Sequence, residues 1–215
     1  MNYHVGVLKL EPKDFEEIDA NIRNILMKYK IHQQPACLQR LYLPRNELGR
    51  GLCSAEFRSE QMLLDLKENL ERSKNISTRR AAIIKVEQDS KSHMSVIENY
   101  IKCKYNLTEH PTQKSLGEAQ KKSLFNEIGK KTNHQKLFNL KSNTHASVTG
   151  SSMWLKHGNI KADEEGRLCG LQDRNLFCGN IPICSHCKEA RGTIDHLATR
   201  CNRMLSHDYT RRHNE

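Results

Sequence analysis

The residues best suited to chemistry lie near the carboxyl end, where a short segment carries three cysteines and a histidine at regular intervals: Cys184, Cys187, His196 and Cys201. Thiolate and imidazole are ligands that zinc prefers, and structural zinc sites arrange four of them in a tetrahedron. The C-x2-C pair closes a tight turn, and Gly192 lets the chain return toward the other two ligands. The spacing therefore predicts a bound Zn²⁺. Because the protein fills all four positions, we expect the ion to be structural and not catalytic.

Other cysteines and histidines leave the choice of ligands open. Three neighbours lie close enough in sequence to replace one of the four, namely Cys169, Cys178 and His186. The alternative interpretation is a pair of buried structural cysteines near an unrelated histidine. Three more cysteines have no such neighbours and are expected in the core: Cys37, Cys53 and Cys103.

The charge of the chain favours a polyanionic partner. There are 35 Lys plus Arg against 25 Asp plus Glu, a net charge of +10, and nucleic acid is the commonest partner of so basic a protein. Seven lysines lie between Lys114 and Lys141 against two glutamates, a local net charge of +5 (7 − 2). We expect phosphate contacts here from Lys121, Lys122, Lys130 and Lys131, the alternative being a solvated helix face.

The cysteine-rich segment has its own candidate contacts with nucleic acid. Guanidinium groups that can bind phosphates flank it, from Arg191, Arg200, Arg203, Arg211 and Arg212. Tyr209 or Trp154 is expected to stack on an unpaired base. The alternative is that each arginine is only a solubilising surface charge.

The bulk composition argues against a compact enzyme. Of the 215 residues 36% are hydrophobic and the mean hydropathy is -0.76, so we expect slender helices and a modest core. The sequence contains neither an apolar run of the roughly 20 residues that a membrane helix needs nor a signal peptide. We therefore expect a soluble intracellular protein, with its cysteines reduced, and not a secreted one.

Hydrophobic periodicity predicts a mainly α-helical fold. Helices are expected over residues 12–30, from Ser54 to about 70, over 79–105 with a break at 88–92, over 116–128 and over 161–176. The last should carry leucines 168, 171 and 176 on one side. Residues 40–52 look β-prone and predict a short hairpin or turn. A polar linker at 132–152 would divide a helical region, 1–131, from a zinc-binding domain, 153–215.

These residues together resemble the region downstream of the polymerase palm in reverse transcriptases of non-long-terminal-repeat retrotransposons. The first part resembles the passage from palm to thumb, on Ile18-Asp19, Arg23, His32, Pro35, residues 40–45 and residues 49–52. The second resembles the stretch before that family's zinc knuckle, on Trp154-Leu155, Gly158, Glu164, Glu165 and Gln172-Asp173. The third resembles the knuckle itself, on the four predicted ligands with Tyr209, Arg212, His213 and Asn214. The match runs in order along nearly the whole chain and is weakest between about 70 and 145.

The chain also departs from the family. Leu48-Gly49 stands where the family usually has Gly-Gly, and Asn24 replaces a lysine. The paired aspartates that hold catalytic Mg²⁺ in the palm are absent, because no Tyr-x-Asp-Asp-like element occurs. Although the family is an RNA-directed DNA polymerase, we expect this chain to be inactive alone. Family members often continue past the knuckle into an endonuclease domain, whereas this sequence stops at Glu215. We therefore expect an open reading frame that retains the thumb and knuckle of a decayed or split element.

The resemblance implies a function in target-primed reverse transcription. The helical part would grip the template-primer duplex, and the knuckle would position element RNA or target DNA, in the nucleus and with no small-molecule substrate. One alternative is a free-standing zinc-knuckle adaptor that binds nucleic acid. The other is an unstable product without function.

Overall fold

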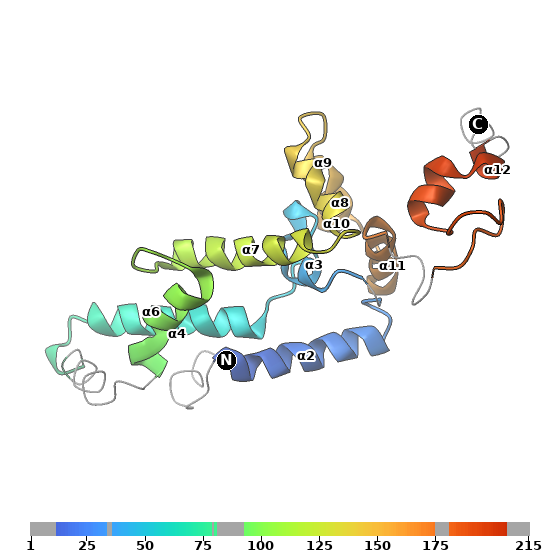
Figure 1. Ribbon diagram of the computed structural model, residues 1–215. Helices are drawn as coiled ribbons and strands as arrows, with labels where there is room; N and C mark the ends of the chain where they lie inside the picture. Colours follow the sequence, from blue (N-terminus) through green and yellow to red (C-terminus); the bar gives the residue numbers. More distant parts are fainter. Residues whose placement is uncertain (1–11, 34–35, 79, 81–92, 175–180, 206–215) are drawn as a thin grey trace. The chain divides into compact units, whose positions relative to one another are not determined.

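The fold is mainly helical, as the sequence predicts. The structure is a computed structural model that describes residues 12–33, 36–78, 80, 93–174 and 181–205, and this part of the chain contains no strand (Figure 1). Its helices are α2 Pro12–Lys28, α3 Leu38–Tyr42, α4 Ala55–Glu71, α6 His93–Tyr105, α7 Gln113–Gly129, α8 Gln135–Phe138, α9 Val148–Ser151, α10 Met153–His157, α11 Ala162–Gln172 and α12 Asn202–Met204. Short turns of other helix types are η1 Arg45–Glu47, η2 Asn139–Ser142 and η3 His196–Arg200. None of the described helices is long and apolar enough to cross a membrane.

Contacts divide the chain into two compact units, each built from two separate segments. The first unit consists of Met1–Asn24 and Gly51–Glu127, and the second of Ile25–Arg50 and Ile128–Glu215. Two of the three boundaries fall within α2 and α7, and the third lies between η1 and α4. The segment 132–152, predicted as a polar linker, contains α8, η2 and α9.

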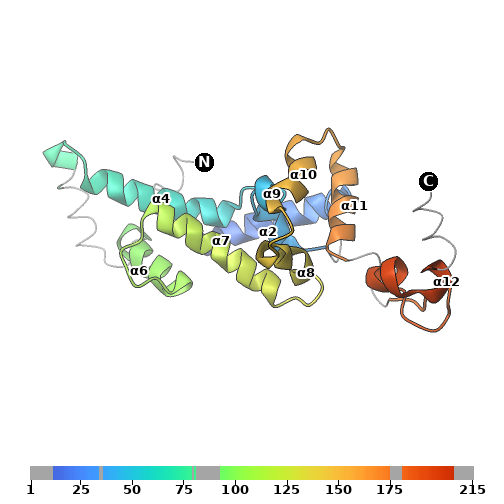
Figure 2. The ribbon, with the colours of Figure 1, turned by 90° about the horizontal axis from the view of Figure 1, so that it is seen from above.

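The first unit has a small apolar core that joins α4 to α6. These two helices pack against each other, as Figures 1 and 2 show in two views. As predicted, α4 begins after Ser54, whose hydroxyl accepts a hydrogen bond from the Phe57 amide at 3.1 Å. The core consists of Phe15, Ala55, Leu63, Leu64, Ile97, Ile101 and Leu116. The part of the predicted 79–105 helix before residue 93 lies largely outside the described residues.

Asp19 provides a second cap for α4 from a distant part of the sequence. Its carboxylate accepts hydrogen bonds from the Ser54 hydroxyl at 2.6 Å, the Ala55 amide at 2.8 Å and the Glu56 amide at 3.2 Å. A buried anion at the start of a 17-residue helix satisfies unpaired amides and complements the helix dipole. The apolar residues of the segment predicted as a helix at 12–30 are only partly buried: Phe15 enters the core, whereas Ile18, Ile25 and Tyr29 are exposed.

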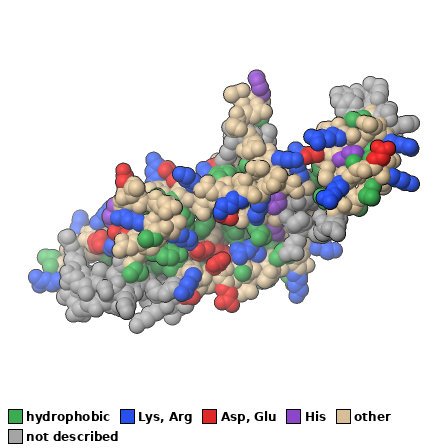
Figure 3. Space-filling model, viewed as in Figure 1, with side chains coloured by type: hydrophobic (Ala, Val, Ile, Leu, Met, Phe, Trp, Pro, Cys, Tyr) green, Lys and Arg blue, Asp and Glu red, His purple; other side chains and the backbone are tan. Residues whose placement is uncertain are grey.

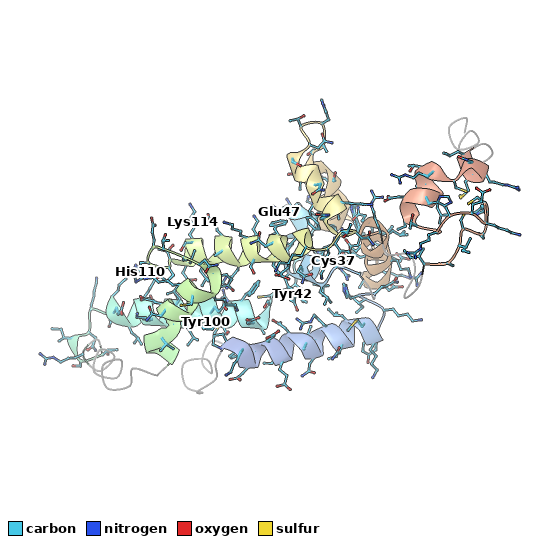
Figure 4. The ribbon with its side chains drawn as sticks, viewed as in Figure 1. Cys37, Tyr42, Glu47, Tyr100, His110 and Lys114 are labelled. Carbon is cyan, nitrogen blue, oxygen red and sulfur yellow. The ribbon has the colours of Figure 1, made fainter. Side chains whose placement is uncertain are left out.

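A polar network lies beside this core. Fully buried Glu60 accepts hydrogen bonds from Lys104 Nζ at 2.5 Å, the Tyr105 hydroxyl at 2.7 Å and Gln120 Nε2 at 2.8 Å. The Lys104 ammonium also lies 5.5 Å from the ring centre of Tyr100, which is labelled in Figure 4. Although burial lowers the pKa of Lys104, the Glu60 and Glu56 carboxylates raise it above its ordinary value. Lys104 thus stabilises the first unit as a charged partner of Glu56 and Glu60.

Of the two predictions for residues 40–52, the β-hairpin is wrong, whereas a turn is present at Leu48-Gly49, where the Gly49 amide donates to the Pro44 carbonyl at 3.0 Å. The segment forms α3 and η1, and buried Arg40 finds partners in a distant part of the chain. Its guanidinium donates to the Leu48 carbonyl at 2.6 Å, and to the Cys169 carbonyl and Asp173 Oδ1, both at 3.0 Å. Leu48 is left-handed, with φ 65°, and a Cβ on Gly49 would lie 2.0 Å from the Leu43 carbonyl oxygen, so the turn requires glycine there.

The buried face of α11 differs from the expected one. Leu168 and Leu171 are exposed, and the buried residues of the helix are Glu165, Gly166, Cys169 and Gly170. Glu165 accepts hydrogen bonds from Arg45 at 2.9 Å and Arg50 at 2.8 Å, and this pairing holds the Glu165 side chain in a buried position. Leu176 lies outside the described residues.

Candidate metal centre

The first two predicted ligands lie on a short antiparallel hairpin. Ile183 pairs with Arg191 in a β-bridge, flanked by hydrogen bonds from the Cys184 amide to the Ala190 carbonyl and from the Gly192 amide to the Pro182 carbonyl, both 2.8 Å. The turn between them closes with a 2.9 Å bond from the Lys188 amide to the Cys184 carbonyl. This local geometry brings the C-x2-C pair together, as its spacing predicts.

The other two ligands lie at the two ends of the five-residue turn η3, because His196 is its first residue and Cys201 follows its last. The Thr193 hydroxyl accepts a hydrogen bond from the His196 amide at 3.1 Å and thereby caps the start of this turn. The turn ends with a 2.7 Å bond from the Cys201 amide to the His196 carbonyl. One wide helical turn thus presents an imidazole and a thiol on the same side.

The structure brings all four predicted ligand atoms into one cluster. The three sulfurs and a ring nitrogen of His196 lie within 4.8 Å of one another, and this group could hold a metal ion. Cys184 Sγ and Cys201 Sγ are 3.8 Å apart, and Cys187 Sγ is 3.3 Å from His196 Nε2. Zinc–sulfur bonds of about 2.3 Å at tetrahedral angles place two sulfurs about 3.8 Å apart, so the sulfur pair fits such an ion.

The cluster also has electrostatics that suit a cation. Backbone amides of Glu189 and Ala190 point at the Cys187 sulfur and lower the pKa of this thiol from 9.0 to about 6. Burial raises the pKa of Cys201. Cys187 is therefore ready to coordinate as a thiolate at neutral pH, whereas Cys201 must lose its proton when a metal binds.

The alternative ligands do not join the group. Cys169 is buried on α11, where burial raises the pKa of its thiol to about 11. His186 is exposed, and neither residue belongs to the metal-binding group found among the described residues. Cys178 lies outside that part of the chain. Of the three cysteines expected in the core, only Cys37 is buried, so the prediction is wrong for Cys53 and Cys103.

The segment that carries the cluster has almost no core. Among its residues 181–205 the buried ones are only Cys184, Gly192 and Cys201. Hydrophobic side chains such as Leu197 and Met204 stay half-buried. Because little apolar surface is removed from water, the segment needs another source of folding free energy.

Basic side chains are exposed on the segment that carries the cluster, and Figure 3 shows Lys and Arg side chains on one face of it. The predicted phosphate contacts Arg191, Arg200 and Arg203 are all exposed, and the analysis of the sequence missed a fourth cation, exposed Lys188. The sequence patterns also did not reveal Asp195, which forms ion pairs with Lys136, at 2.5 Å, and with Arg174. Its position next to a ligand histidine was the available signal.

The remaining predicted contacts are dispersed. Lys121 is half-buried and Lys122 is exposed, both in the first unit. Lys130 is exposed in the second unit, where Lys131 donates a hydrogen bond to Gln39 at 2.8 Å. Trp154 is half-buried on α10, and three candidates lie outside the described residues, namely Tyr209, Arg211 and Arg212.

Comparison with models of known protein families, with curated proteins and with solved structures found no match. The class that the geometry itself defines is a mainly helical chain with a Cys3His group near its carboxyl end.

Proposed function

We propose that the Cys3His group binds Zn²⁺ as a structural ion and that the metal-bound segment, residues 181–205, binds nucleic acid. The observation that carries the proposal is the convergence of three sulfurs and an imidazole within 4.8 Å. Three thiolates favour zinc over harder ions such as Mg²⁺ or Ca²⁺. The lack of an apolar core supports a structural role for the ion, because its binding would supply the missing folding free energy.

The charge of the segment supports the second half of the proposal. Lys188, Arg191 and Arg200 are exposed on the segment that carries the Cys3His group, in a chain whose net charge is +10. Cations so placed bind phosphates and release counterions, which makes affinity dependent on salt. By contrast, the arginines at 40, 45 and 50 pair with Glu165 on α11 or with Asp173 directly after it, and hold the second unit together.

We further propose that the chain is the thumb and knuckle portion of a retrotransposon reverse transcriptase, acting on element RNA and target DNA. The resemblance described above supports this. So does Leu48, whose left-handed backbone, φ 65°, is one that glycine adopts without strain, as the family's Gly-Gly would. The main rival is a free-standing adaptor. Palm motifs encoded directly upstream of Met1 would favour the polymerase, and an isolated expressed gene would favour the adaptor.

The metal is tested by a substitution and a matched control. Purified full-length chain should bind one zinc ion, and Co²⁺ in its place should show the absorption of tetrahedral thiolate coordination. Cys187→Ser should lose this binding, whereas exposed Cys53→Ser, outside the group, should retain it. If Cys187→Ser binds cobalt as the parent chain does, the assignment is wrong.

Nucleic-acid binding is tested on the same proteins. Chelation should unfold residues 181–205, leave most of the helical circular dichroism, and weaken binding to a labelled polynucleotide at low salt. Binding that is unchanged by chelation and by Cys187→Ser would show that this segment is not the interface.

A further inference from the structure

The hairpin that carries the first two ligands has a second face. Residues alternate between the two faces of a strand, so Ile183 points away from the metal side that Cys184 occupies. The burial agrees: Cys184 is buried and Ile183 is 66% exposed. The bridge partner Arg191 lies on the same face as Ile183.

The hydrogen bonds place these two side chains especially close. The bonds flank the Ile183–Arg191 pair and do not join it, which defines a non-hydrogen-bonded pair. Side chains approach each other more closely in such pairs than in hydrogen-bonded ones. An exposed branched apolar group therefore lies directly beside a planar guanidinium.

We infer that the Ile183–Arg191 face binds an unpaired nucleic-acid strand, with the isoleucine against the plane of a base and the guanidinium stacked on a base or paired with its phosphate. The inference rests on the proposed function and specifies its ligand. Only unpaired bases present their planar faces to a protein, because in a duplex these faces are stacked on one another. Exposed Lys188 and Arg200 on the same segment supply the positive charge that a strand requires.

The rest of the hairpin fits this ligand. The metal-side residues Cys184 and Gly192 are buried, so Ile183 and Arg191 are held on a frame that the ion would fix. The charge favours a polyanion over an apolar protein partner, because the hairpin exposes two basic residues, Lys188 and Arg191, and one acidic residue, Glu189. RNA and DNA share the base and phosphate that the face would contact.

The test compares single-stranded and duplex probes on the zinc-loaded full chain. Fluorescence anisotropy with labelled oligouridylate, oligothymidylate and a DNA duplex should show tighter binding of both single strands. Ile183→Thr keeps the branched β-carbon and removes apolar surface, so it should weaken single-strand binding about fivefold and leave duplex binding unchanged. Ile76→Thr is the matched control, since Ile76 is 75% exposed elsewhere, and it should change neither.

Arg191→Lys separates stacking from charge. It keeps the positive charge and loses the planar group, so single-strand affinity should fall while the slope of affinity against salt stays the same. Zinc content measured on each variant reports whether the hairpin is folded. Equal affinity for strand and duplex, or an Ile183→Thr variant that loads zinc and binds strands normally, would overturn the inference and leave metal-dependent binding intact. Nucleic-acid affinity that stays the same after zinc is removed by a chelator would instead refute the proposed function.

Discussion

Replacing Arg40 with methionine should destabilise the second unit strongly. The guanidinium is 1% exposed and donates to two carbonyls, to Gln172 and to the equally buried carboxylate of Asp173. Methionine fills similar space without donating a hydrogen bond. Asp173 would then lose its paired positive charge and keep the bond from the Cys37 amide, at 3.0 Å.

The size of the effect follows from what is left behind. Removing one partner of a buried ion pair costs about 3–5 kcal/mol, because the other charge stays buried and uncompensated. A whole domain is typically stable by about 5–15 kcal/mol, so the loss should be a large fraction of the total. Removing both charges in Arg40→Met with Asp173→Leu relieves that penalty. The Leu48 carbonyl would still lack the Arg40 donor and the Cys37 amide would lack the Asp173 acceptor, at about 1 kcal/mol each, whereas the Cys169 carbonyl keeps a hydrogen bond from the Asp173 amide. The double variant should therefore lose about 2 kcal/mol, less than the Arg40 variant alone.

Tryptophan fluorescence provides the assay, because Trp154 is the only tryptophan and lies on α10 in the second unit. Urea unfolding of the four proteins in the cycle gives the free energy of unfolding for each. Arg45→Met is the matched control: Arg45 is 44% exposed and pairs with Glu165, so its loss should cost no more than about 1 kcal/mol. An Arg40→Met loss as small as that of the control, or a double variant whose loss is the sum of the two, would refute the reasoning.

Two further predictions concern two other buried ionisable groups, Asp19 and His32. Asp19→Ala should lower the free energy of unfolding by about 2–3 kcal/mol, because three donors at the start of α4 lose their acceptor. The control is Glu17→Ala, which removes the same type of charge from an exposed residue of α2 and should cost under about 0.5 kcal/mol. Equal losses of the two variants in urea unfolding would contradict the role of Asp19 as a cap. His32 should make the second unit sensitive to acid: burial, and next the Arg50 charge, lower the pKa of this imidazole from 6.5 to about 4, so its neutral form contributes stability above pH 6.5 that is lost as the pH falls toward 4. The loss between about pH 7 and pH 4.5 should be about 2–3 kcal/mol larger in the parent chain than in His32→Phe, and an identical loss in both would show that His32 does not titrate this way.

The sequence was most informative where the relevant interactions are local. Helical periodicity and the Ser54 cap depend on residues a few positions apart, and α2, α4 and α7 were predicted close to their observed bounds. The metal group was predictable for the same reason, because two tight turns bring together four ligands that are close in sequence.

The sequence was least informative where a side chain finds its partner far along the chain. The Leu-Tyr-Leu run at 41–43 has high strand propensity, yet Arg40 binds carbonyl and carboxylate groups about 130 residues away and the segment forms a helix. On α11 the leucines suggested the buried face, but the arginines at 45 and 50 draw Glu165 inward instead. No local pattern encodes such ion pairs, since either partner alone resembles a surface charge.

The two sources of stability in this chain have a consequence for binding. The helical units are held by apolar cores and buried ion pairs that need no metal, whereas residues 181–205 bury little more than two of the proposed ligands. Under the proposed function, the surface that binds nucleic acid exists only while those ligands are held together. Metal and polynucleotide must then favour each other's binding by the same factor, because linkage is reciprocal. A strand bound at Arg191 would therefore raise the chelator concentration needed to remove zinc at equilibrium, although it touches none of the four ligands.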